Sequence, residues 1–223
     1  MPAPRRYRNI SDLPAVIPVF PLTGALLLPR SRMPLNIFEP RYLAMVDAAM
    51  DRYRMIGIIQ PKHGGEDMAK KPALAEVGCA GRITEYSETD DGRYLITLTG
   101  IARFHVSGEL DAQSAFRQIA ADYAFFAADL LSTEDPPIPR GRLLAALKPY
   151  LTERAMQTDW KSIEDAPAEN LVNALAMLCP FEAGEKQALL EAPGLKERAD
   201  VLITLLEIAN ASAMPSGGTQ SIN

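Results

Sequence analysis

The hydrophobic pattern of the first half of the chain is that of short extended segments. Apolar runs broken by prolines cover residues 16–22, 25–29 and 33–38, and a further run covers residues 54–60. Runs of this length bounded by Pro and Gly predict strands, and those that contain proline suit an edge or an irregular strand. The first half is therefore predicted to be mainly β.

A single helix interrupts these strands. Between residues 40 and 50 the apolar positions recur at helical spacing. Pro40 suits the first turn of this helix, because its missing N–H would have no helical partner there. Glu39 beside it suits the positive end of the helix dipole. The pattern predicts one short helix between the third and fourth strands.

The strongest β signal follows. Segments 76–86 and 93–98 flank Asp-Asp-Gly, and Asp-Gly between extended segments indicates a hairpin. Strands are also predicted at 101–106, with Arg103 on the polar face of its alternating pattern, and at 116–125. Five or six strands without crossover helices predict a closed or partly closed barrel, which hides the edges that an open sheet exposes.

The second half of the chain is helical in pattern. Helices are predicted from about residue 140, over 171–178, over 185–191 and over 195–209. Strands followed by helices indicate an α+β fold, and the proline-rich segment 132–139 marks a domain boundary. The predicted organisation is a small β-barrel domain with one short helix in residues 1–131, an α-helical bundle in 132–211 and a disordered tail in 212–223.

Composition and charge restrict the possible functions. Of the 223 residues, 48% are hydrophobic and 23% charged, as in globular proteins, and the net charge is -5. An acidic balance without a basic stripe disfavours nucleic acid as a partner. Two cysteines far apart, no signal-peptide run and no apolar stretch of membrane-spanning length predict a cytoplasmic protein with no membrane association.

The sequence lacks the motifs of common catalytic and metal sites. Neither a GxxxxGK phosphate loop nor GxGxxG is present, and HExxH and GxSxG are absent as well. The two histidines and two cysteines are not spaced as zinc ligands. We predict no catalytic residue, no cofactor and no metal ligand, so the protein is not expected to be an enzyme.

Two segments together carry a family resemblance. Residues 17–29 (IPVFPLTGALLLP) and 34–42 (PLNIFEPRY) resemble the opening of the N-terminal substrate-recognition domain of Lon-type proteases. Residues 57–60, 76–83 and 98–104 match later positions of the same domain in order. The resemblance covers roughly residues 16–122 and continues more loosely through the helices, and it depends on the motifs occurring together.

The resemblance implies a PUA-like barrel followed by a helical bundle. In Lon this part selects and holds protein substrates, whereas the ATPase and the Ser-Lys peptidase lie further along and are missing from this chain. The chain therefore resembles a stand-alone, non-catalytic module that binds unfolded protein segments or a protease or chaperone partner. The alternative is RNA binding, since PUA-like barrels include RNA-binding members. The oligomeric state is left open.

Five residues near the first helix are candidates for peptide contact. These are Arg30, Phe38, Glu39, Arg41 and Tyr42. An exposed strand edge or an apolar groove beside them would accept an extended segment. The alternative is structural, with Phe38 and Tyr42 in the core and with Glu39 and Arg41 paired at the start of the helix.

Overall fold

The computed structural model describes residues 7–62, 72–131, 137–156 and 158–213. The chain forms two compact units, the first from residues 1–134 and 176–191 and the second from residues 135–175 and 192–223. The linear boundary proposed after residue 131 stays a prediction. The predicted tail lies outside the described residues, except for Ser212 and Ala213, which end the last helix.

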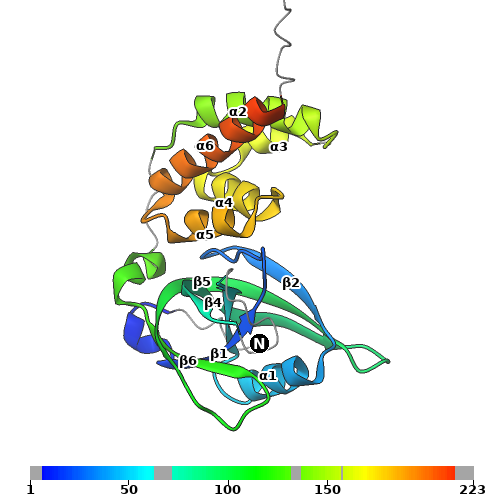
Figure 1. Cartoon of the computed structure of the whole chain (residues 1–223), viewed down its shortest axis with the longest axis vertical. Helices are drawn as coiled ribbons and strands as arrows, with labels where there is room; N and C mark the ends of the chain where they lie inside the picture. Colours follow the sequence, from blue (N-terminus) through cyan, green and yellow to red (C-terminus); the bar gives the residue numbers. More distant parts are fainter. Residues whose placement is uncertain (1–6, 63–71, 132–136, 157, 214–223) are drawn as a thin grey trace, which may run out of the picture. The chain divides into compact units, whose positions relative to one another are not determined.

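The strands of the first unit form one six-stranded sheet in the order β2-β5-β4-β3-β1-β6, and β6 also pairs with β5 (Figure 1). The strands are β1 (Val16–Pro21), β2 (Arg32–Ile37), β3 (Met55–Pro61), β4 (Leu74–Glu88), β5 (Tyr94–Glu109) and β6 (Arg117–Asp122). β1 and β3 are parallel and the other pairs are antiparallel. Five strands thus close a ring and β2 is added outside it. The result is an irregular barrel within the predicted α+β class.

β5 changes partner along its length. Its first part pairs with β2 and its last part with β6. At the change, the loop before β2 bonds to Gly100: the Arg30 N–H donates to the Gly100 carbonyl (2.8 Å), and the Gly100 N–H donates to the Ser31 carbonyl (2.9 Å). A Cβ on Gly100 would lie 2.0 Å from the Leu28 carbonyl oxygen. Glycine is therefore required at position 100, which lies between the part of β5 that pairs with β2 and the part that pairs with β6.

Two predicted strands differ from the structure. Residues 25–29 form an irregular segment in which Leu26, Leu27 and Leu28 are all buried. The strand predicted over 116–125 ends at Asp122, whose carboxylate accepts the N–H of Ala124 at 2.9 Å. This bond opens the 3-10 segment η2 (Ala124–Leu130).

The barrel interior is built around one aromatic ring. Phe104 of β5 is fully buried. A Cβ on Gly57 would lie 3.0 Å from its ring, and a Cβ on Gly78 would lie 2.5 Å away. Glycines on the neighbouring strands therefore make the space that Phe104 fills, which is how native interiors reach close packing.

Arg103 and Asp129 form a buried ion pair in the described part of the first unit, although the alternating pattern places Arg103 on the polar face of its strand. Arg103 Nη2 lies 2.8 Å from Asp129 Oδ1, and the two side chains are 3% and 8% exposed. The Arg103 side chain also donates to the Leu190 carbonyl of α5 (Ala183–Glu191) at 3.0 Å, and its guanidinium lies 4.3 Å from the centre of the Phe126 ring. The pair therefore joins β5, η2 and α5.

The second unit is helical. It contains α2 (Arg140–Glu153), α3 (Trp160–Asp165), the part of α4 (Ala168–Leu178) up to residue 175, and α6 (Leu195–Ala213). α2 packs against α6, where Arg142 and Glu207 form an exposed ion pair and Asn210 donates to the Ala146 carbonyl. α3 was not predicted, because its six residues are too few to show a helical period. No helix in the described part of the chain is both long and apolar enough to cross a membrane.

We expect the change Asp129→Ala to destabilise the first unit by about 3–5 kcal/mol, because it leaves the Arg103 guanidinium buried without a counter-charge. Urea unfolding followed by circular dichroism measures the loss. The matched control is Glu76→Ala, which breaks the exposed Lys62–Glu76 pair and should move the unfolding midpoint little. Equal losses of unfolding free energy in the two variants would show that the buried pair stabilises the protein no more than the exposed pair does.

A second expectation concerns Gly100. The change Gly100→Ala drives a methyl group into the Leu28 carbonyl and should cost about 1–3 kcal/mol or more. Gly108→Ala in the same strand is the control, since a Cβ there meets nothing within 4 Å. The unfolding midpoint should fall for the first variant and hold or rise for the second. A stable Gly100→Ala protein would contradict the close approach.

Candidate functional site

Helix α1 (Pro40–Met50) has the predicted bounds and lies beside β1 and β3 in the first unit (Figure 1). Its buried residues are Tyr42, Met45, Val46 and Ala49. The Tyr42 ring lies 4.2 Å from the ring of Phe20 on β1, measured between centres. Burial is the main influence that raises the pKa of the Tyr42 hydroxyl. The structural alternative is therefore confirmed for Tyr42.

The charged candidates at the start of α1 are paired. Arg41 Nη2 lies 2.8 Å from Glu39 Oε2, and both side chains are about half exposed. The Arg41 guanidinium also lies 4.5 Å from the centre of the Tyr42 ring. The predicted ion pair at the helix start is thus present, and its arginine lies over the face of the tyrosine ring.

The remaining two candidates lie at opposite ends of β2. Phe38 follows the strand and is 62% exposed, so its core alternative is wrong. Arg30 precedes the strand and donates to the Asp129 carbonyl at 2.5 Å. Six extended residues span roughly 20 Å, so the structure separates Arg30 from the other four candidates. Its side chain anchors the loop to η2.

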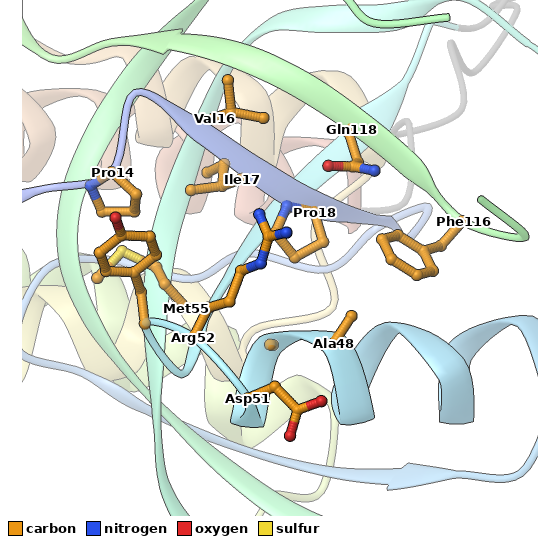
Figure 2. Close-up of a pocket in the computed structure, with 12 residues that line it drawn as sticks. Pro14, Val16, Ile17, Pro18, Ala48, Asp51, Arg52, Met55, Phe116 and Gln118 are labelled. Atoms are coloured by element: carbon orange, nitrogen blue, oxygen red, sulfur yellow. The ribbon is translucent and has the colours of Figure 1, made fainter. Parts of the chain in front are cut away.

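Two neighbouring pockets lie along α1. The pocket at the N-terminal end has a volume of about 590 Å³ and is lined by Pro21, Arg41, Tyr42, Pro61, Pro72, Leu110, Asp111, Ala112, Ser114, Ala115, Phe116 and Arg117. The pocket at the C-terminal end has about 300 Å³ and is lined by Pro14, Val16, Ile17, Pro18, Ala48, Ala49, Asp51, Arg52, Tyr53, Met55, Phe116 and Gln118 (Figure 2). Phe116 lines both, and we call the two together the α1 groove.

The α1 groove has the dimensions of a short extended peptide. An eleven-residue helix is about 16 Å long, which equals about five residues of extended chain at 3.3 Å each. Prolines and aromatic rings make up much of its wall. Its lining comes from four separate stretches of sequence, within residues 14–21, 41–55, 61–72 and 110–118, so the pattern around residues 38–42 identified only one end of it.

Charges at the N-terminal pocket are largely neutralised within the protein. Arg117 of β6 forms two bonds with the Glu109 carboxylate, at 2.8 and 2.6 Å, and donates to the Pro72 carbonyl at 2.7 Å. Arg41 is held by Glu39. These arginines serve local pairs and do not form an open basic stripe.

A third pocket, of about 420 Å³, lies between β3, β4 and α5. Here Gln60 donates to the Ala183 carbonyl at 2.9 Å, and Gln187 donates to the Val77 carbonyl at 3.1 Å. These bonds satisfy the amides and fasten α5 to the barrel. Both cysteines are buried, and the described residues contain no group of three or more His, Cys, Asp or Glu side chains that could hold a metal ion.

Known proteins resemble this chain over most of its length. Lon protease 2 from Myxococcus xanthus is 25% identical over 212 residues, which are 92% of this chain and 25% of that protein. Lon protease from Escherichia coli strain K12 is 23% identical over 86% of the chain and 24% of its own length. This chain thus spans about a quarter of the length of these relatives.

Solved structures share the fold. The crystal structure of a Lon N-terminal domain protein from Xanthomonas campestris has a TM-score of 0.60 at 20% identity, covering 85% of this chain and 97% of that one. The N-terminal domain of Mycobacterium avium complex Lon protease gives the same TM-score at 16% identity. The profile of the ATP-dependent protease La (LON) substrate-binding domain matches residues 16–207. The chain therefore belongs to the LON substrate-binding domain family.

Proposed function

We propose that this protein is a non-catalytic module that binds extended, unfolded protein segments in the α1 groove. The observation that carries the proposal is the run of two pockets along α1, joined at Phe116 and lined by prolines and aromatic rings. Such surfaces suit extended polypeptide, which offers apolar side chains and little secondary structure. Family membership supports a substrate-binding role.

The groove is a better receptor than the free strand edge. Among the described strands β2 pairs only with β5, so its other edge is open. Pro34 lies in the middle of β2 and has no N–H to donate to an added strand. Proline at an edge is a common means of preventing strand addition. We therefore favour side-chain pockets over β-augmentation.

The proposed role is capture of a segment, with delivery to a protease or chaperone partner. The matched region corresponds to the substrate-binding domain of the relatives and not to their ATPase or peptidase parts. The RNA-binding alternative is not favoured, because the two arginines at the N-terminal pocket are paired with carboxylates and the net charge of the chain is -5. A cytoplasmic setting is part of the proposal and agrees with two free, buried cysteines.

Filling the groove should abolish capture without weakening the core. Ala115 is exposed and lines the N-terminal pocket, so Ala115→Trp should occupy the space intended for a ligand side chain. We expect at least a tenfold loss of affinity for a fluorescein-labelled, reduced and carboxymethylated lactalbumin, which is permanently unfolded. Fluorescence anisotropy measures the binding.

The control is Ala127→Trp, an exposed alanine of η2 outside both pockets. It adds the same bulk and should leave affinity unchanged. Circular dichroism checks that both variants are folded. Unchanged binding by a folded Ala115→Trp protein would remove the α1 groove from the proposal, and absence of binding by the unmodified protein would refute capture itself.

A further inference from the structure

The C-terminal pocket of the α1 groove is lined by Arg52, for which the described part of the chain supplies no partner. Arg52 follows α1 and is exposed. Among the residues that the structure describes, its guanidinium has neither an ion pair nor a hydrogen bond, whereas Arg41 and Arg117 at the other end of the groove are both paired. The charge at this end of the groove is therefore available to a ligand.

The pocket places this cation opposite an apolar wall. Figure 2 shows the Arg52 guanidinium directed toward β1 near Pro18, and Phe116, the residue just before β6, beside it. The carboxylate of Asp51 points away from the pocket in the same view. Val16, Ile17, Pro18 and Met55 complete the apolar lining. One small cavity thus combines a positive charge, the Gln118 amide and a hydrophobic surface.

The end of α1 does not cancel this charge. A helix C-terminus is partly negative because its last carbonyls lack helical partners. In α1 two of these carbonyls are bonded: the Ala49 carbonyl accepts the N–H groups of Arg52 (3.2 Å) and Arg54 (2.7 Å), and the Asp47 carbonyl accepts that of Asp51 (3.0 Å). Arg52 and Asp51 are the charged residues that line this pocket, and Figure 2 shows the Arg52 guanidinium, not the Asp51 carboxylate, directed toward the apolar wall.

We propose that this pocket recognises the C-terminus of a protein chain that ends in an apolar residue. Arg52 binds the terminal carboxylate, and the wall formed by β1 and Phe116 holds the last side chain. The inference rests on the proposed capture of extended segments and adds which part of a client is bound. The rest of the client chain runs along α1 toward Tyr42.

The size of the cavity favours a chain end over an internal acidic residue. At a C-terminus the carboxylate and the side chain leave the same Cα, so both fit one cavity of about 300 Å³, which is the lower end of the range for ligand pockets. Within an extended chain, neighbouring side chains point to opposite faces. An internal aspartate or glutamate would therefore direct its carboxylate away from the adjacent apolar side chain.

The test uses the whole chain and three labelled ten-residue peptides of otherwise identical sequence. One ends in leucine with a free carboxylate, one ends in leucine amide, and one carries an internal glutamate before a leucine amide. Fluorescence anisotropy gives the Kd of each for the unmodified protein, for Arg52→Gln and for Arg54→Gln. Arg54 is the matched control, because it is an exposed arginine two residues away that does not line the pocket.

We expect the peptide with the free carboxylate to bind at least tenfold more tightly than the peptide amide. The reason is that only the carboxylate can form a charge-assisted hydrogen bond with Arg52. Arg52→Gln should lower acid binding to the level of the amide, and Arg54→Gln should keep the difference. Added salt should reduce the difference between the Kd values of the acid and amide peptides, because the charges in a pocket open to solvent are screened.

Equal binding of acid and amide by the unmodified protein would overturn this inference and leave the proposed capture standing. Tighter, Arg52-dependent binding of the internal-glutamate peptide would also overturn it, in favour of an acidic internal motif. Loss of the acid preference in both arginine variants would assign it to general charge and not to the pocket. If none of the peptides binds, nor the unfolded lactalbumin, the proposed function itself fails.

Discussion

The buried pair between Arg103 and Asp129 fixes the first unit at the point where its strand pairing changes. Two charges removed from water are stabilised only when the geometry is good and further hydrogen bonds satisfy them, and here the Asp129 carboxylate accepts both the side chain and the backbone N–H of Arg103. The Asp129 carbonyl holds Arg30 as well. Because Arg30 sits in the loop that bonds to Gly100, one ion pair sets the position of η2, the loop and the start of β2.

The position of the groove follows from this arrangement. β2 leads directly into α1, so the loop that starts β2 also sets where the helix begins. β1 and β6 are paired over residues 16–19 and carry Val16, Ile17 and Gln118 into one wall. The groove is thus formed where the helix lies beside the sheet, and hydrogen-bonded strands form its base. A rigid base limits the conformational entropy lost when a segment binds.

The helix and most strands were predictable because their signals are local. The bounds of α1 follow from helical spacing and Pro40, and the hairpin follows from Asp-Gly. Arg103 was assigned to the polar face because alternation records only its neighbours, whereas its partner lies 26 residues away. Phe116 had no signal, since its role depends on the meeting of stretches that lie far apart in sequence. Arg52 likewise resembles any charged residue after a helix until the surrounding pocket is seen.

The chain passes between the two units three times, since residues 176–191 return to the first unit before the last helix joins the second. During synthesis the first unit cannot be completed when its last strand leaves the ribosome. It must wait for about seventy further residues, until α5 can supply the Leu190 carbonyl to Arg103. Until then the Arg103 guanidinium, although it can pair with Asp129, lacks its hydrogen bond to α5. The two units are therefore expected to mature together, and neither can be transferred to another protein by one recombination event.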